Sequence, residues 1–254
     1  ESKNSAKKAF EDSYFLSNSS LFKTIPAQFS SYHESYLKNL ESLSPKKVLM
    51  KASAIEFPDE NDIAKLEPYW AKSTPLTITS AKGEADLHGK VHLAYSQKSL
   101  FVRAEIADDF PMNNDKSGGD IWNGDGLELC ISLDKDADPG REFYGPKDFQ
   151  IGISPGKPDQ GIKPSIWAWG SLKKSPDGAV IDVQKTSSGY LIQAIIPWAS
   201  LASDFIPQKG WELGFDCAID DADQGSKDRQ SQSIWCGDGN FYANPSQWGI
   251  LTLE

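Results

Sequence analysis

The residues best suited to ligand chemistry lie in segment 120–129, DIWNGDGLEL. Trp122 stands in a polar, glycine-containing loop, and Glu128 lies in the alternating segment that follows, on the side opposite the leucines. An exposed indole can stack on the C–H face of a sugar ring, while a carboxylate accepts hydrogen bonds from hydroxyl groups. The pattern predicts either a sugar site built on Trp122 and Glu128, or a loop plug beside a solvated charge.

Two further segments carry side chains of the same kind. Gln150, in the segment DFQI, offers one acceptor and two donors. Tyr242 and Asn244 lie in the loop NFYANPSQWG before the last apolar segment, where Tyr242 is placed to form a second aromatic wall. We therefore add Gln150, Tyr242 and Asn244 to the candidate ligand-binding residues.

Two acidic clusters are candidates for a hard cation such as calcium, which prefers oxygen ligands. The first alternates with other residues in a turn and consists of Asp134, Asp136 and Asp138. It is not an EF-hand loop, because the glycine is displaced and the distal glutamate is missing. The second follows an apolar segment and consists of Asp220, Asp221 and Asp223. For the second cluster, an ion-pair network with Arg229 that fixes the loop is the alternative interpretation.

The motifs of common enzymes are absent from the sequence. None of the three histidines, His33, His88 and His92, lies in an HExxH motif, and GxSxG, the P-loop and GxGxxG do not occur. Carboxylates are plentiful, but no pair stands out as the acid and base of a glycosidase. The sequence therefore predicts no catalytic residue and no organic cofactor.

These candidate residues belong to an acidic chain of ordinary hydrophobicity. The 254 residues are 39% hydrophobic, include eight tryptophans and carry a net charge of -10. Such a charge does not suit binding to a phosphate backbone, and no apolar run reaches the roughly 18 residues of a membrane helix. We therefore expect no nucleic acid partner and no membrane span.

The three cysteines have neither zinc spacing nor the even count of a disulfide scaffold.

Alternation of apolar and polar residues recurs from about residue 48 to the C-terminus. In segment 99–107 the residues Leu100, Val102 and Ile106 share one face, and in 126–133 the leucines do the same. Similar short segments, separated by glycine, proline, asparagine and aspartate, are 91–95, 149–154, 165–170, 180–184, 190–196, 213–220, 232–235 and 248–253. This pattern predicts an all-β fold, an antiparallel β-sandwich. Trp167 and Trp169 share one face of 165–170. We assign this face to the core; the alternative is an outward face on which the two rings form another platform.

Residues 1–48 differ from the rest of the chain. They are rich in serine, lysine and asparagine, and Tyr32, Tyr36 and Leu40 have helical spacing before Pro45. We interpret 1–48 as a helical or linker extension, either the tail of a preceding domain or an addition to the sandwich. The sandwich then occupies 49–254.

The ordered set of segments resembles the family 9 carbohydrate-binding modules, best known from xylanases. The resemblance runs from about Ala54 to the C-terminus, and each motif is weak alone. In chain order the motifs are Asp108-Asp109, Trp122 with Asp125 and Glu128, Asp148-Phe149-Gln150, Gly189-Tyr190, Ile196-Pro197-Trp198, Gly214-Phe215, Asp220 to Asp223, Arg229 and Asn244-Pro245-Ser246.

The resemblance implies a β-sandwich with jelly-roll character, structural calcium, and a cleft in which two aromatic side chains clamp a sugar, often at the end of a glycan. Trp122 would be one wall and Tyr242 the other, with Glu128 bound to sugar hydroxyls. Tyr242 stands where the family often has tryptophan, and Gln150 stands where some members carry arginine. These two departures leave the preferred sugar open.

We therefore expect non-catalytic binding of a mono- or oligosaccharide by a monomer that is secreted, periplasmic or on the cell surface. Such a chain would be an accessory module of a glycoside hydrolase or of a cell-surface protein. One alternative is a structural or adhesion sandwich without a small ligand. Another is a b-type haem domain with Met112 and either His88 or His92 as axial ligands. The last alternative is an enzyme that uses carboxylates as catalytic groups in a pattern that we do not recognise.

Overall fold

The computed structural model describes residues 48–56 and 62–254. The predicted extension therefore lies outside the described residues, apart from Val48. The elements of the described part are β1 (Leu49–Ala54), η2 (Ile63–Leu66), α3 (Glu67–Trp70), β2 (Leu76–Thr79), β3 (Leu87–Tyr95), β4 (Ser99–Asp108), η3 (Gly118–Asp120), β5 (Gly126–Ser132), β6 (Asp148–Ser154), η4 (Pro158–Gln160), β7 (Ser165–Ala168), β8 (Val180–Lys185), β9 (Gly189–Pro197), α4 (Trp198–Leu201), β10 (Glu212–Asp221), β11 (Ser231–Ile234), η5 (Pro245–Gln247) and β12 (Gly249–Leu253).

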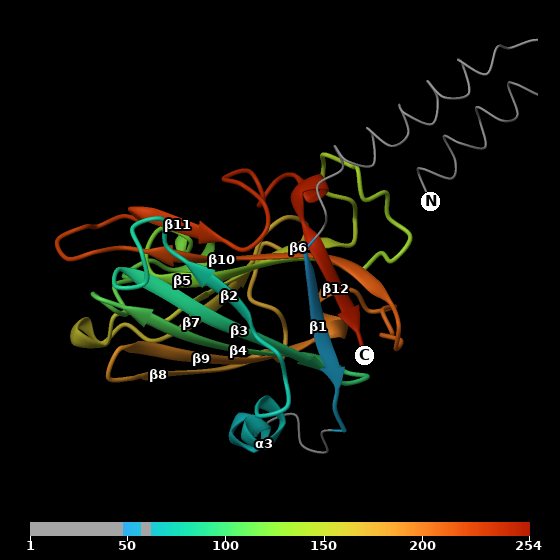
Figure 1. The fold of residues 1–254 in the computed structure, drawn as a ribbon, viewed down its shortest axis with the longest axis horizontal. Coiled ribbons are helices and arrows are strands. Elements are labelled where there is room, and N and C mark those ends of the chain that lie inside the picture. The colour runs from blue at the N-terminus through green and yellow to red at the C-terminus, as the bar shows by residue number, and fades with distance from the viewer. Residues whose placement is uncertain (1–47, 57–61) are drawn as a thin grey trace, which may run out of the picture. The chain divides into compact units, whose positions relative to one another are not determined.

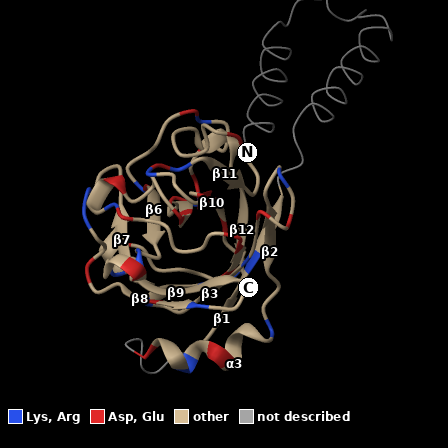
Figure 2. Cartoon of the chain, turned by 90° about the vertical axis from the view of Figure 1, so that its left-hand side faces the viewer, with Lys and Arg blue, Asp and Glu red and all other residues tan. Residues whose placement is uncertain are grey.

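The strands form two stacked layers (Figures 1 and 2). Sheet A has the order β7-β6-β5-β10-β12, with β11 beside β10. Sheet B has the order β3-β4-β9-β8, with β2 beside β3. The predicted all-β sandwich is confirmed, and β3 to β12 correspond to the ten predicted segments. Strands β1 and β2 were not predicted.

Strand β1 belongs to both sheets. Its first four residues pair with β12 of sheet A, and its last two pair with β3 of sheet B. Both pairings are parallel, whereas every other strand pair of residues 48–56 and 62–254 is antiparallel. The sandwich is therefore closed along one side by a single strand that crosses between its layers.

The core lies between the sheets and contains the apolar rows that the alternation predicted. Leu127 and Leu129 of β5 belong to the same buried cluster as Val102 and Ile106 of β4. The layers approach closely at Gly89 of β3, because a Cβ there would lie 2.3 Å from Cδ1 of Ile219 in the facing sheet. Burial of these side chains is the main force that holds the sheets together.

The outer face of each sheet is also partly covered. Helix α3 and η2 lie against sheet B, where Leu66 and Trp70 pack on Phe101 (Figure 2). On sheet A, Phe241 and Trp248 pack with Cys130 and Ala218. The strand faces that alternation assigns to solvent are therefore buried where these segments cross them. No helix among the described residues is long and apolar enough to span a membrane.

Candidate functional site

Glu128 lies on the outer face of sheet A, because its neighbours Leu127 and Leu129 point into the core. In register, Gly152 of β6 and Ala218 of β10 lie on either side of it. Both direct neighbours of Glu128 on this face are therefore small residues. It is only 2% exposed, so the interpretation of a solvated charge is excluded.

A network of polar side chains surrounds the Glu128 carboxylate. Gln150 Nε2 donates to Glu128 Oε2 at 2.5 Å. Arg229 Nη1 lies 2.7 Å from Asp220 Oδ1 and 3.4 Å from Glu128 Oε1. Gln232 Nε2 lies at 2.8 and 3.4 Å from the same two oxygens. We call Glu128, Gln150, Asp220, Arg229 and Gln232 the polar cluster.

The electrostatics of the polar cluster centre on two buried carboxyl groups and one guanidinium. Burial and the charge of Glu128 raise the pKa of Asp220 well above its ordinary value, and Arg229 opposes this shift. Arg229 and Gln232 both lie closer to Asp220 Oδ1 than to Glu128 Oε1. Oxygen Oε1 of Glu128 therefore has two long contacts and retains capacity to accept a further hydrogen bond.

Trp122 lies at the edge of the polar cluster. Its side chain is 40% exposed, and the Arg229 Cζ atom lies 5.0 Å from the centre of the indole ring. Asn123 fixes the loop, since its Nδ2 donates to Asp228 Oδ1 at 2.7 Å and its Oδ1 accepts from the Arg229 backbone at 2.9 Å. Trp122 is therefore a partly exposed aromatic ring held by its loop, as the sugar-platform interpretation requires.

Tyr242 lies on the loop that covers the neighbouring part of the same face. It is 50% exposed, whereas the preceding Phe241 packs on Cys130 and Ala218, and Ala218 lies opposite Glu128. The Asp216 carboxylate anchors this loop by accepting from the backbone of Cys217, Cys236 and Gly237. Tyr242 is thus on the face that carries the polar cluster.

Asn244 has a structural partner in this loop. Its Oδ1 caps η5 by accepting from the Ser246 backbone at 3.1 Å and from Ser246 Oγ at 2.7 Å. The other four candidate ligand residues lie on the outer face of sheet A or on loops beside it.

The assignment of Trp167 and Trp169 to the core is wrong. Their neighbours Ile166 and Ala168 occupy the core, while Trp167 lies opposite Gly152 in register on the outer face. Both rings are half-buried because residues 118 and 119 pack on them, and Trp169 Nε1 donates to the Gly119 carbonyl at 2.9 Å. The two tryptophans thereby support the loop that carries Trp122.

The ion pair of Asp220 with Arg229 confirms the alternative interpretation of the second acidic cluster, whereas the contacts of both side chains with Glu128, and Gln232 altogether, were not predicted from the sequence. Asp220 and Gln232 are register partners in the β10–β11 hairpin, and both occur in predicted strands. If the pairing of these two strands had been predicted, it would have placed Asp220 and Gln232 side by side. Arg229 reaches the cluster from the hairpin loop, and no periodicity in the sequence predicts that path.

Two surface clefts of about 560 and 350 Å³ lie elsewhere, around the ends of β3 and β4 and the β8–β9 turn. None of the five candidate ligand residues lines either cleft. His88 lines both, but Met112 packs in the main core and His92 Nδ1 is 2.6 Å from Ser73 Oγ. These placements do not favour the haem alternative.

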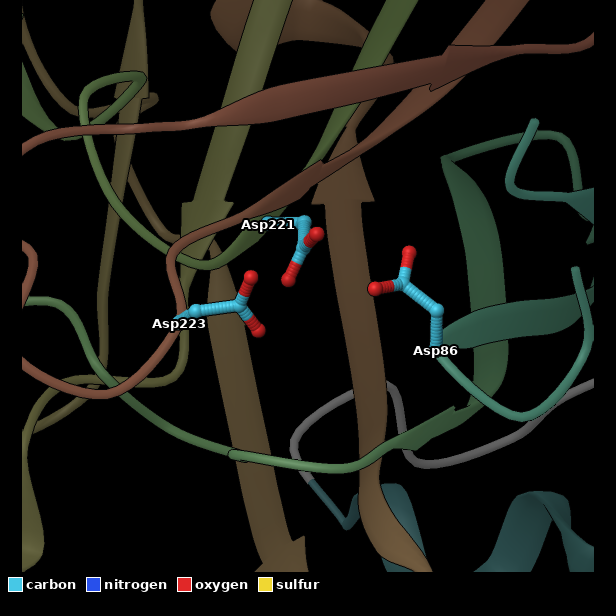
Figure 3. A group of neighbouring side chains, drawn as sticks. All are labelled: Asp86, Asp221 and Asp223. Atoms are coloured by element: carbon cyan, nitrogen blue, oxygen red, sulfur yellow. The ribbon is translucent and has the colours of Figure 1, made fainter. Parts of the chain in front are cut away.

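Carboxylates converge at two other places in the described residues. In the outer acidic group, Asp86, Asp221 and Asp223 point toward one another (Figure 3). Lys82 Nζ lies 3.1 Å from Asp86 and 3.3 Å from Asp223, so this group contains a cation of the chain itself. The inner acidic group consists of Asp108, Asp125 and Asp221, all buried.

Among the described ion pairs, the inner acidic group meets a lysine only at its shared member, since Lys82 Nζ lies 3.9 Å from Asp221, and neither Asp108 nor Asp125 contacts a lysine or arginine. Asp125 accepts from the Asn113 and Ala222 backbones, but Asp108 Oδ2 is buried and no N–H or O–H group of the described residues donates to it. Burial raises the pKa of both Asp108 and Asp125, and the charge of Asp221 raises both further. The charge of Asp108 also raises the pKa of Asp125. Buried carboxylates that repel one another fit a bound cation.

The structure does not bring Asp134, Asp136 and Asp138 together as a three-carboxylate group. All three are exposed in their turn. Asp134 accepts from the Asp136 backbone and Asp138 from the Gly140 backbone, so these side chains stabilise the turn itself. Asp220 also lies apart from the acidic groups, because it faces Arg229. Of the second predicted cluster, Asp221 and Asp223 belong to the groups of converging carboxylates.

Comparison with known proteins shows the family of the chain. A family described as carbohydrate family 9 binding domain-like matches residues 64–254. The chain belongs to this family. The predicted resemblance is confirmed, and with it the prediction of a binding module rather than an enzyme.

Two curated relatives match this chain over a small part of their own length. They are Exoglucanase XynX from Acetivibrio thermocellus and Endo-1,4-beta-xylanase A from Thermoanaerobacterium saccharolyticum, each 25% identical over 191 residues. The match covers 74% of this chain but only 16% and 15% of the relatives. The similarity therefore concerns a small part of each relative.

Solved structures show the same fold at low identity. A family 9 module from Caldicellulosiruptor kristjanssonii in complex with cellotriose matches with a TM-score of 0.60 and 18% identity, over 82% of this chain and 94% of that one. The same organism's module in complex with glucose matches with a TM-score of 0.59 and 17% identity, over 82% and 96%. At these identities the likeness establishes the sandwich fold.

Proposed function

We propose that this family 9 module binds sugar on the outer face of sheet A, with Trp122 as the stacking platform and the polar cluster as the reader of hydroxyl groups. The observation that carries the proposal is the exposed indole of Trp122 beside a network of oriented amides and carboxylates. Stacking buries the apolar face of the sugar, while the amides of Gln150 and Gln232 meet its hydroxyl rim.

Tyr242 is the proposed second wall. It supplies a smaller ring than tryptophan, so we expect a modest affinity, on the order of micromolar to millimolar for so small a contact. Glucose and cellotriose, bound by the two solved family members, are the first ligands to test. Glu128 is nearly buried, and we propose that Oε1 contacts the ligand when the side chain of Arg229 or Gln232 shifts.

The test is isothermal titration of the chain with glucose, xylose, galactose and cellotriose. We expect saturable binding, which Trp122→Ala weakens by about tenfold or more because it removes the stacking surface. Ile206→Ala, an exposed apolar residue outside the proposed site, serves as the matched control. Unchanged affinity in Trp122→Ala would exclude this face as the site. Absence of binding by the whole panel would favour the structural or adhesion interpretation.

We also propose that the chain is a module of a longer polysaccharide-degrading or cell-surface protein and acts outside the cytoplasm. The similarity to small parts of an exoglucanase and a xylanase supports this. Polymeric substrates of that kind occur outside cells, so a secreted, periplasmic or cell-surface location follows.

Calcium is the cofactor that we propose, at the inner acidic group. Asp108 ends β4, Asp125 precedes β5 and Asp221 ends β10, so one ion would join three strand ends. Bound calcium would neutralise these carboxylates and fix the loop that begins before Trp122. The orphaned Asp108 Oδ2 supports this position over the outer acidic group, since Lys82 lies 3.1 Å from Asp86 and 3.3 Å from Asp223 but 3.9 Å from Asp221, the acid that the two groups share.

Thermal unfolding with and without calcium tests this cofactor. An ion at one hundred times its Kd stabilises the folded state by about 2.7 kcal/mol, which raises Tm by roughly 5–10 °C for a chain of this size. Asp125→Asn should abolish the calcium-dependent shift. Asp134→Asn, in the exposed turn, should retain it, and the reverse pattern would place calcium in that turn.

A further inference from the structure

Two buried amides, Asn113 and Asn114, lie between the loops that carry the proposed sugar site. The Trp122 loop consists of residues 117–125, and the β10–β11 loop consists of residues 222–230. The two asparagines are only 7% and 0% exposed, and we call them the amide clamp. Buried amides bind fixed polar partners, so they hold in place the backbone that they contact.

Asn113 contacts both loops. Its Nδ2 donates to the Ala222 carbonyl at 2.7 Å and to the Asp223 carbonyl at 3.2 Å, in the β10–β11 loop. Its backbone N–H donates to Asp125 Oδ2 at 2.7 Å, at the end of the other loop. The second oxygen of Asp125, Oδ1, accepts from the Ala222 backbone at 2.7 Å. One amide and one carboxylate thus tie the two loops together.

Asn114 fixes the Trp122 loop from within. Its Nδ2 donates to the carbonyl groups of Ile121 and Asp125, each at 2.7 Å. Gly124 leaves room for this side chain, because a Cβ there would lie 2.6 Å from Asn114 Cγ. The clamp therefore holds the loop on both sides of the residue that carries the indole.

Asp125 connects the amide clamp to the inner acidic group. Its carboxylate binds backbone donors on both sides, and one of its oxygens lies within 4.8 Å of carboxylate oxygens of Asp108 and Asp221. Like charges at this separation repel one another, and the repulsion acts on the residue that ties the loops together. A cation shared by the three carboxylates would replace this repulsion by attraction and hold Asp125 against its two backbone donors.

We infer that the amide clamp couples the inner acidic group to the sugar site, so that calcium and sugar strengthen each other's binding. The inference rests on the proposed function and concerns the regulation of that site. A sugar needs Trp122 and Arg229 in fixed positions, and both belong to loops that the clamp and Asp125 tie together. Two ligands that stabilise the same ordered arrangement of loops bind with positive cooperativity. Asn113 is thus a positioning residue, which acts through its loop contacts.

The test uses the reciprocity of coupled binding, because each ligand must change the affinity for the other by the same factor. Isothermal titration measures the Kd of cellotriose in calcium and in EDTA, and the Kd of calcium with and without saturating cellotriose. We expect each Kd to fall by about fivefold or more when the other ligand is present, and by equal factors.

The possible failures are distinguishable. Equal cellotriose affinity in calcium and in EDTA, with calcium still raising Tm, would overturn the coupling and leave both binding sites intact. A chain that binds cellotriose but no calcium would overturn the calcium site together with the coupling. Absence of cellotriose binding in both conditions would overturn the sugar site and, with it, the coupling.

The variant Asn113→Ala separates coupling from stability. It removes Nδ2 but keeps the backbone donor to Asp125, so calcium should still bind and raise Tm, while the coupling factor should fall toward one. Gln97→Ala is the matched control and should keep the full factor. Gln97 Nε2 also donates to a backbone carbonyl, that of Pro207 at 3.3 Å, but it precedes β4, whereas Asp108 ends this strand. A lower Tm for Asn113→Ala with an unchanged coupling factor would show a purely structural clamp and overturn the inference.

Discussion

Arg229 combines a structural and a ligand-facing role in one side chain. It offsets the charges of two acids buried beneath it and covers part of the Trp122 ring. Removal of one member of a buried charged network leaves the others without compensation. The residue should therefore contribute to the stability of the folded chain as well as to the shape of the site.

We predict that Arg229→Met lowers the free energy of unfolding by about 2 kcal/mol, a value below the usual range for a buried pair because the Arg229 side chain is 24% exposed. Adding Asp220→Asn should recover part of this loss, since the second acid no longer needs a counter-ion. A double-mutant cycle by urea denaturation measures the coupling. Purely additive effects would show that Arg229 and Asp220 do not interact energetically.

Asp216 makes stability depend on pH. Burial raises its pKa from 3.8 to about 6 in the folded state, although three backbone N–H groups oppose the shift. Between about pH 6 and pH 3.8 the folded chain thus binds a proton that the unfolded chain does not, so this group's contribution to stability rises as pH falls. It is lost as pH rises through about 6.

We predict that Asp216→Asn removes this contribution, roughly 2–3 kcal/mol between pH 4 and pH 6, from the pH dependence of the unfolding free energy. Urea denaturation of both proteins across this range measures the difference. At neutral pH native Asp216 is ionised and carries the cost of a buried charge, so the neutral amide should leave the variant at least as stable as the native chain. Parallel pH curves for the two proteins would contradict the prediction.

At the scale of elements, the loop that carries Trp122 depends on β6 and β7. A Cβ on Gly152 of β6 would lie 2.5 Å from the Trp169 ring, and Trp169 in turn donates to the Gly119 carbonyl. Glycine at 152 therefore lets Trp169 reach this loop. Strand β6 thus leaves room for the Trp169 ring, and this ring supports the loop that carries Trp122.

We predict that Gly152→Ala displaces Trp169, costs about 1–3 kcal/mol of stability and weakens sugar binding by loosening the Trp122 loop. Gly140→Ala is the control, because a Cβ there meets only Asp138 Oδ1 at 3.4 Å in an exposed turn. Calorimetry of unfolding and titration with cellotriose measure the two effects. Full affinity with reduced stability would mean that Trp169 supports the fold and leaves the platform in place.

The sequence predicted strands where alternation ran over at least four residues with turn residues on both sides. Strand β2, LTIT, alternates in burial as well, but four residues after a helix and a proline give little signal. The outer face of β5 was assigned to a site or to solvent, yet all seven residues of the strand are buried. Its cover comes from the loop around Phe241, more than a hundred residues away, and alternation within one strand carries no information on such contacts.

The site was predicted in part for the same reason. Trp122, Glu128, Gln150 and Tyr242 belong to local patterns, and the structure places them on one face of sheet A or on loops beside it. The partners of Glu128 and the converging acids depend on strand pairing. Asp86, for example, lies in the turn before β3 of sheet B, whereas Asp221 ends β10 of sheet A, so the two meet only after the sandwich forms (Figure 3). Spacing along the chain instead predicted a cation site at Asp134, Asp136 and Asp138. In the structure Asp134 and Asp138 stabilise their own turn.

At the scale of the whole molecule, β1 completes the sandwich because it pairs with an edge in each layer. Its Met50 and Ala52 are buried, and its backbone pairs with β12 and then with β3. Without it, both neighbours would present unpaired backbone groups, and the core would open along one side. This strand directly follows the residues that the sequence analysis assigned to a separate extension.

We therefore predict opposite outcomes for two truncations. A chain that starts at Lys47 keeps β1 and should unfold cooperatively and bind sugar as the full chain does. A chain that starts at Glu56 lacks β1 and should lose cooperative unfolding, because Met50 alone contributes about 2–3 kcal/mol of apolar burial and six residue pairings are lost with it. Calorimetry and sugar titration of both chains measure this. If the chain from Lys47 also fails to fold, residues 1–46 belong to the same folding unit, and the predicted boundary at residue 48 is wrong.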